Sequence, residues 1–319
     1  MERLDEFRIY YNHTVHPELV RMELKRKKLL RLLLLSTFLL SVFIGVELYI
    51  GVLLVALIGA IPIFFYISWL IYQVQKFRRT FKPNVVKLLL DFLDDRLNYG
   101  EFRYDAKKYV SKNDFMASQI FTTSANIYQG EDYITGSIGN LEFELCEIRV
   151  QDTSPVDSSL RDVFKGIFLR SSFDVPVQGK LLVIPRKQKQ FLERSVKKLI
   201  ASGGRKMERT LWDSVFEEMF VAYTQDGGTR SWISDSGTIL AKDILSTEMQ
   251  KSIADYCKTY RKQIYFSVID QEIYLFLTEP KDFLEPYFFR SNVSFELVKE
   301  FFEDVELVIK IIEEFDRFY

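Results

Sequence analysis

The chain has 319 residues, of which 48% are hydrophobic and 27% are charged, and this composition excludes an intrinsically disordered protein. The formal net charge is −1, but residues 1–82 are basic, with 12 Lys and Arg against 6 Asp and Glu, and the rest of the chain is acidic. Cys146 and Cys257 are the only cysteines, and their spacing matches neither a disulfide framework nor a zinc site, so we expect two buried, reduced thiols.

Residues 1–28 are predicted to form a cytosolic lead followed by a helix. Pro17 suits the first turn of a helix, and the residues after it run on toward an apolar segment. His13 and His16 are the only histidines in the chain. Two loosely placed imidazoles do not complete a zinc site, so we predict no metal at this end.

Residues 32–75 form the longest apolar run, and Glu47 is its only formal charge. A single helix of these 44 residues would be about 66 Å long, roughly twice the thickness of the hydrocarbon core of a bilayer. The run must therefore fold back, and Gly45 and Gly51 mark the break around the acidic residue. The sequence predicts a transmembrane helical hairpin within residues 29–75, with spans at 29–46 and 50–72.

Basic residues flank both ends of the predicted hairpin. Loops rich in Lys and Arg stay on the cytoplasmic side of a membrane, so we predict a multi-pass protein with both termini in the cytoplasm. A removed signal sequence does not fit, because about 28 largely polar residues precede the run and a second span follows it. The flanking cations are Lys25, Arg26, Lys27, Lys28 and Arg31 before the first span, and Lys76, Arg78, Arg79 and Lys82 after the second.

Residues 76–319 are predicted to form a cytosolic α+β region in which an antiparallel sheet packs with helices. A helix is expected at 83–98 and a shorter one near 113–120. Residues 127–138 and 141–150 then alternate, and Gly139-Asn140 joins them as a hairpin. The apolar phase of the second strand shifts after Leu145, which predicts a bulge near Cys146.

The second half of this region continues the same mixture of strands and helices. A basic segment at 186–209 contains Gly203-Gly204 and marks a candidate sub-boundary between two parts. Ser294 can cap a final helix. The other predicted elements are a hairpin of 163–173 with 180–184, a strand at 212–223, a helix at 246–260, and a hairpin of 264–268 with 273–277.

The basic segment supplies one candidate site. If residues 187–200 are helical, Leu192, Val196 and Leu199 share one face, and Lys187, Phe191, Arg194 and Lys198 lie on the other. Such a face can contact an anionic membrane surface. Two alternatives stay open, a solvated helix with one exposed aromatic residue and a nucleic-acid surface. The acidic remainder of the region and the membrane tether disfavour nucleic acid.

Glu131, Asp132 and Lys165 form a second candidate, a polar site. The glycines around the two acidic residues favour a turn and a bulge over a metal site, because the sequence shows no second set of carboxylates at ligand spacing. A phosphate-binding loop, a nucleophile elbow and a zinc-protease helix are all missing from the sequence. We therefore predict no catalytic residue, no metal and no cofactor.

Three motifs and the hairpin that precedes them resemble a known family. The motifs are Gly130-Glu131-Asp132-Tyr133-Ile134-Thr135-Gly136, Val163-Phe164-Lys165-Gly166-Ile167-Phe168 and Phe283-Leu284-Glu285-Pro286. Together they resemble the bacterial domain of unknown function 3137, whose members are membrane proteins often encoded beside a LemA-type membrane protein. The resemblance implies a bacterial inner-membrane location and a LemA-type partner, and it carries over no catalytic residue.

An anchor followed by a packed region without recognisable chemistry favours a non-enzymatic, membrane-anchored interaction or scaffold protein. One alternative is a membrane-associated enzyme that acts on lipid or envelope substrates, which would need polar groups that only the fold could bring together. Another is an accessory subunit of a transporter. Two spans that lack a membrane-embedded charged pathway would need to form an oligomer for that role.

Overall fold

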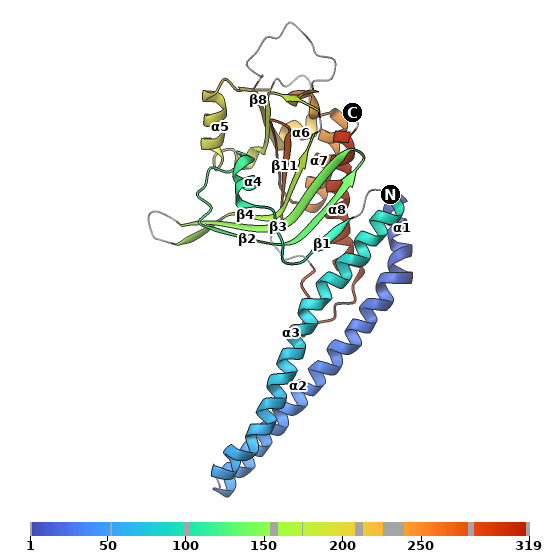
Figure 1. The fold of residues 1–319 in the computed structure, drawn as a ribbon, viewed down its shortest axis with the longest axis vertical. Helices are drawn as coiled ribbons and strands as arrows, with labels where there is room; N and C mark the ends of the chain where they lie inside the picture. The colour runs from blue at the N-terminus through green and yellow to red at the C-terminus, as the bar shows by residue number, and fades with distance from the viewer. Residues whose placement is uncertain are drawn as a thin grey trace. The chain divides into compact units, whose positions relative to one another are not determined.

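The computed structural model describes residues 2–51, 53–97, 102–153, 159–173, 175–207, 213–225, 239–279 and 284–316 (Figure 1). The chain forms two compact units, each built from two separate stretches of sequence. The first unit, here the helical unit, contains Met1–Leu93 and Leu284–Phe302. The second, here the sheet unit, contains Asp94–Phe283 and Glu303–Tyr319.

Helices make up most of the helical unit. They are α1 (Glu2–Tyr10), a π-helical turn (Tyr11–Val15), α2 (His16–Ile50) and α3 (Leu53–Leu97). The lead before Pro17 is thus helical from Glu2. Packing of Phe7 holds this N-terminal helix in place. Its ring stacks on that of Phe302 with centroids 4.0 Å apart and lies 5.4 Å from the ring of Phe92.

A buried ion pair holds α2 against the residues that follow the sheet. Arg26 donates to both carboxylate oxygens of Glu23, at 2.8 and 2.6 Å, and also to the carbonyl of Phe288. The backbone N–H of Asn292 lies 3.4 Å from Glu23 Oε2. The hydrogen bond to Arg26 is the main reason that the pKa of Glu23 is lowered, so the pair stays ionised inside the helical unit.

The chain reverses direction where the sequence predicted a break. Gly51 adopts a left-handed conformation with φ 81°, and its N–H donates to the carbonyl of Glu47. The residues predicted to form a helix at 83–98 are helical up to Leu97, but they do not form a separate helix. They continue α3, which runs through Pro62 and Pro83 without interruption. Buried side chains on both sides of Pro83, including Phe81 and Val86, hold the helix together across the missing hydrogen bond.

The parts of α2 and α3 near the reversal carry exposed apolar side chains. Phe38 and Phe65 are 64% and 69% exposed, whereas Leu19, in the first turn of α2, is fully buried. The two helices approach each other closely at Gly59, where an added Cβ would lie 2.5 Å from the ring of Phe43. Both helices are long and apolar enough to cross a membrane.

The sheet unit is built on nine antiparallel strands in the order β1-β2-β3-β4-β11-β10-β6-β8-β7. This α+β architecture, two long apolar helices followed by an antiparallel sheet with helices, confirms the predicted fold class at that level. A short parallel pair, β5 (Val177–Gln178) with β9 (Ile239–Leu240), stands apart. The nine strands are β1 (Arg103–Asp105), β2 (Ile127–Ile138), β3 (Leu141–Thr153), β4 (Leu160–Ser172), β6 (Lys180–Pro185), β7 (Arg205–Lys206), β8 (Phe220–Gln225), β10 (Ile264–Ile269) and β11 (Glu272–Thr278).

The predicted hairpin between residues 163–173 and 180–184 is wrong. The hairpin of β10 and β11 lies between these strands, with β11 paired to β4 and β10 paired to β6. All four strands have apolar side chains buried on both faces, so their sequences do not identify a partner. Gly166 fixes one contact, because at its φ of 148° an added Cβ would overlap the carbonyl oxygen of Leu277 on β11.

The bulge lies opposite Cys146, near the predicted position, but the extra residue is on β2 and not on β3. Glu131 pairs with Glu147 and Ile134 with Leu145, so β2 has one extra residue, and Asp132 takes a positive φ of 59°. The change of apolar phase on β3 has a different cause. Leu145 and Cys146 are both buried, because each face of the strand is covered there.

Helices cover both faces of the sheet (Figure 1). Those on one face are α4 (Lys112–Ala117) and α5 (Glu193–Ala201), whose Phe115 and Val196 join a core cluster with Phe168 and Phe276 of the sheet. The neighbouring strand residues point to the opposite face, where α6 (Ser214–Met219), α7 (Thr247–Tyr260) and the second half of α8 (Phe295–Asp316) lie.

The predicted strand at 212–223 begins too early. Asp213 accepts hydrogen bonds from the N–H groups of Val215 and Phe216 and starts α6, so β8 begins only at Phe220. Two other predictions are confirmed, namely α7, which Ser246 caps, and the β10–β11 hairpin.

Candidate functional site

The basic segment after β6 is not one continuous helix, so the helical arrangement considered for residues 187–200 holds only from Glu193 onward. A 3-10 turn (Arg186–Gln188) is followed by turns up to Leu192, and α5 begins at Glu193. The buried side chains of Leu192, Val196 and Leu199 attach this segment to the core. Phe191 lies just before the helix and is 57% exposed.

The four predicted membrane-contact residues fall in different surroundings. Phe191 and Arg194 line a cavity of about 360 Å³, together with Arg161, Asp152 and Asp162. Lys187 is exposed on the 3-10 turn. Lys198 shares a face of α5 with Ser195 and Leu199 and lines a separate cavity. The structure thus leaves Lys187, Phe191 and Arg194 as an exposed basic and aromatic surface, here called the α5 surface.

The predicted polar site spreads over three neighbouring strands. Glu131 on β2 lies opposite Glu147 on β3, and Lys165 on β4 lies opposite Arg149, two residues along β3 from Glu147. Carboxylate oxygens of Glu131, Asp132 and Glu147 lie within 4.8 Å of one another. The sequence analysis did not name Glu147, although the register of the predicted hairpin through Gly139-Asn140 was the signal that could have placed it beside the two acidic residues.

The acidic group is anchored by a tyrosine. Tyr104 on β1 donates its hydroxyl hydrogen to Asp132 Oδ1 at 2.5 Å. Burial, and then the adjacent Asp132 carboxylate, raise the pKa of Tyr104, so its hydroxyl stays protonated and keeps donating. Carboxylate oxygens are ligands that suit hard cations, but proximity of this kind is also common among acidic side chains that bind no ion.

Asp162, three residues before Lys165 on β4, lies at the surface. Arg149 donates to it at 3.0 Å, and Gln151 donates at 2.8 Å. Both side chains of the Arg149–Asp162 pair are about half exposed. The hydrogen bond from Arg149 is the main cause of the lowered pKa of Asp162.

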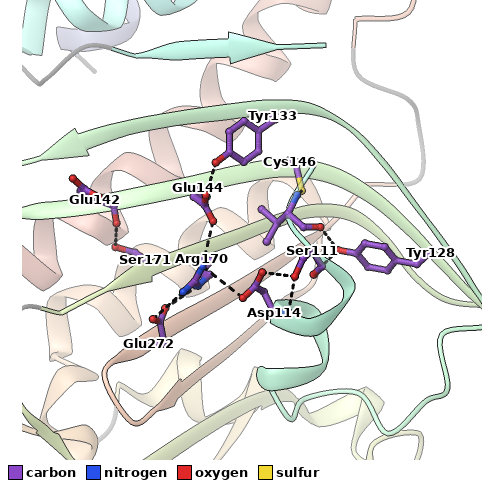
Figure 2. A network of polar contacts seen from close by, with 11 residues as sticks. Ser111, Asp114, Tyr128, Tyr133, Glu142, Glu144, Cys146, Arg170, Ser171 and Glu272 are labelled. Carbon is purple, nitrogen blue, oxygen red and sulfur yellow. Dashed lines mark hydrogen bonds and ion pairs between the residues drawn. The ribbon is translucent and has the colours of Figure 1, made fainter. Parts of the chain in front are cut away.

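Arg170 on β4 is the centre of a larger polar network (Figure 2). Its guanidinium donates to both oxygens of Glu272 on β11, at 2.9 and 3.0 Å. Glu144 on β3 lies 3.4 Å away and Asp114 on α4 lies 3.5 Å away. One cation therefore joins three strands and a helix, and the hydrogen bond to Glu272 is the main reason that its pKa is raised.

The network continues on both sides of the arginine (Figure 2). Tyr133, from the bulge of β2, donates to Glu144. Ser111 donates to Asp114 at 2.5 Å and accepts from the Asp114 N–H, which caps α4. These contacts fix the position of α4 over the sheet. The sequence offered no signal for Arg170, because its partners come from three separate elements, α4, β3 and β11.

A second ionic group lies beneath α7 and α8 in the sheet unit. The Lys262 ammonium lies 2.7 Å from both oxygens of Asp304 and 2.5 Å from Glu279, and Tyr256 donates to Asp304. Burial raises the pKa of Asp304 to about 6. Burial disfavours the Lys262 ammonium, but attraction to Asp304 outweighs it and raises the pKa of Lys262.

Both cysteines are buried, as the sequence predicted. Burial raises the pKa of Cys146 and that of Cys257 to about 12. Each therefore stays a protonated thiol at neutral pH and is a poor nucleophile.

Comparison with known proteins identifies part of the chain. Residues 162–317 match a family model described as "Protein of unknown function (DUF3137)". The match begins in β4 and ends in α8, and it includes Lys165 and the α5 surface. No curated protein and no solved structure matches the chain.

Replacement of Arg170 by methionine is expected to lower the free energy of unfolding by about 2 kcal/mol at pH 7, because three carboxylates then lose their shared cation. The loss should shrink toward pH 4, where protonation removes the repulsion among them. Denaturant unfolding of the full chain in detergent measures this. The matched control, Arg149→Met, breaks a half-exposed pair and should cost less than about 1 kcal/mol. Equal losses in the two variants would contradict the assignment.

The raised pKa of Asp304 predicts a distinct pH dependence. Between its ordinary value of 3.8 and about 6, the folded protein holds a proton that the unfolded chain has released. The free energy of unfolding should therefore fall as pH rises through this window, by at most about 3 kcal/mol from this group. Asp304→Asn should remove that fall, whereas the exposed Asp255→Asn control should keep it. Parallel pH profiles for wild type and Asp304→Asn would show that Asp304 titrates normally.

Proposed function

The chain carries a DUF3137 family domain at residues 162–317, and we propose that the helical hairpin holds this domain at a bacterial inner membrane as a non-enzymatic interaction module. The observation that carries the proposal is the exposed apolar surface of α2 and α3. Burying a single leucine or phenylalanine side chain contributes about 1.5–3 kcal/mol. A dozen such side chains left in water would cost more than the whole stability of an ordinary domain.

The charges around the hairpin support the orientation that the sequence predicts, with both termini in the cytoplasm. Two of the nine flanking cations, Arg26 and Lys82, are buried in the helical unit and do not face the membrane surface. Most of the others are exposed and remain on the same side of the two spans. The exposed cations are Lys25, Lys27, Lys28 and Arg31 on α2, and Lys76, Arg78 and Arg79 on α3.

Binding explains the sheet unit better than catalysis does. Arg170 pairs with Glu272, and Lys262 pairs with Asp304. Both ion pairs join different layers of the sheet unit and so have a structural role. The three residues of the predicted polar site, Glu131, Asp132 and Lys165, do not line the cavity of about 360 Å³. A LemA-type membrane protein is the partner that the family resemblance implies.

The α5 surface gives this module a second contact with the membrane. Phe191 is exposed beside Lys187 and Arg194, and a basic surface with an aromatic side chain suits the interface of an anionic leaflet. Each Lys or Arg near such a surface contributes about 1 kcal/mol. The tether would raise the local concentration of lipid, so a weak contact is sufficient.

The hairpin topology predicts which positions can be labelled from outside the cell. A cysteine at Glu47 should react with a membrane-impermeant maleimide added to intact spheroplasts. A cysteine at Lys258, which is exposed on α7, should react only after the membrane is opened. The two native thiols should not react with the maleimide, because both are buried. Labelling of Lys258→Cys in intact spheroplasts, or protection of Glu47→Cys, would overturn the orientation.

Contact of the α5 surface with lipid can be followed in the reconstituted full chain. A polarity-sensitive fluorophore on Gln190→Cys should shift to shorter wavelength in vesicles that contain anionic lipid, and the shift should weaken with salt. Lys187→Glu with Arg194→Glu should abolish the shift. Lys251→Glu, an exposed charge reversal on α7, should leave it unchanged. The same shift in neutral vesicles would mean that the surface does not recognise anionic lipid.

A further inference from the structure

A second, smaller cavity lies within the sheet unit, between α4, α5 and the sheet. Its volume is about 190 Å³. Four segments build it, namely the end of α4, the start of β6, one face of α5 and the end of β10. The side chains that matter for its chemistry are Ser118, Lys180, Ser195, Lys198, Ser202 and Ser267.

Strand register places Lys180 on the floor of this cavity. Lys180 pairs with Ile269 on β10, and Leu182 pairs with Ser267. Leu182 and Ile269 belong to the core cluster on the face that α4 and α5 cover. Residues two apart on a strand share a face, so Lys180 lies on that same face, at the end of the strand.

Lys198 approaches the cavity from the helix wall. Ser195, Lys198, Leu199 and Ser202 are spaced i, i+3, i+4 and i+7 along α5, so they form one face of the helix. All four line the cavity. Two lysine side chains from different elements therefore line one small space, and Lys198 is also exposed to solvent.

No acidic side chain among the described residues lines this cavity. The described lining contains two lysines and no carboxylate. Across the described part of the chain, neither Lys180 nor Lys198 pairs with an acidic side chain, whereas the adjacent Lys197 forms an ion pair with Glu193 at 2.7 Å. Two nearby like charges repel each other, and an anion between them would turn repulsion into attraction.

Buried hydroxyl groups complete a polar lining. Ser118, Ser195 and Ser267 are almost fully buried. Ser267 donates to the Ser118 carbonyl at 2.8 Å, which fixes the floor. Ser195 and Thr122 share one hydrogen bond of 2.8 Å, so of their two hydroxyl hydrogens one remains for another acceptor. Ser118 and Ser202 donate their hydroxyl hydrogens to the carbonyls of Phe115 and Leu199, so Ser195 is the one described serine of the lining whose hydroxyl is not committed to a backbone carbonyl.

The size of the cavity limits the ligand. Pockets for drug-sized molecules have volumes of about 300–1,000 Å³, so a cavity of about 190 Å³ holds only a compound of few atoms. Lysine binds phosphate groups as a point charge, and hydroxyl donors bind the same oxygens. We propose that this cavity binds a phosphate group, as inorganic phosphate or as part of a small phosphorylated compound, between Lys180 and Lys198.

The test measures binding of radiolabelled inorganic phosphate to the full chain in detergent by equilibrium dialysis, with chloride keeping the ionic strength constant. Wild type should bind one phosphate per chain. Lys180→Gln and Lys198→Gln should each weaken binding by at least tenfold. The matched control, Lys197→Gln, removes a cation one residue away that does not line the cavity, and it should bind as wild type does.

Further arms identify the source of the phosphate group. If glycerol phosphate displaces the radiolabelled phosphate in neutral nanodiscs, the natural ligand is a soluble phosphorylated compound. Loss of phosphate binding only in nanodiscs that contain phosphatidic acid would show a lipid headgroup. Circular dichroism verifies that each variant is folded, and Ser195→Ala, which keeps both lysines, should weaken binding less than either lysine variant. No phosphate binding by wild type, or equal binding by wild type and both lysine variants, would overturn the proposal.

Discussion

Burial of the central strands on both faces is the constraint on which the sheet unit depends. On one face, the rings of Phe168 and Phe276 stack with centroids 4.5 Å apart. On the other face, Leu169 and Leu275 are fully buried beneath the second layer of helices. Because neither face of these strands is exposed to water, a charged side chain inside this unit needs oppositely charged or hydrogen-bonding partners. An unpaired buried charge costs several kcal/mol.

That requirement explains how the ionic groups are arranged. Arg170 is surrounded by three carboxylates and Lys262 by two, and in both groups the partners come from different elements. The groups therefore join layers as well as balance charge. Against this background, Lys180 and Lys198 differ from Arg170 and Lys262, since the lining of their cavity, as far as the structure describes it, contains no carboxylate.

The helical unit, in contrast, leaves apolar side chains exposed over part of its length. Near residues 284–302, its side chains are buried among aromatic rings and around the Glu23–Arg26 pair. Toward Gly51, the same two helices expose phenylalanine and leucine side chains. A surface of that kind is stable only where something apolar covers it, and the exposed apolar parts of both helices are long enough for a membrane to do so.

The sequence by itself determined the apolar hairpin with its reversal at Gly51, the β2–β3 and β10–β11 hairpins, and α7, because each depends on neighbours along the chain. A run of apolar residues, a two-residue turn or a capping serine acts over a few positions. Only the tertiary structure decided the strand order, the side of the bulge, the place of Glu147, the partners of Arg170 and the cavity between Lys180 and Lys198. Strands buried on both faces lose the alternation that would reveal their orientation, and their pairing is set by packing between segments up to about a hundred residues apart.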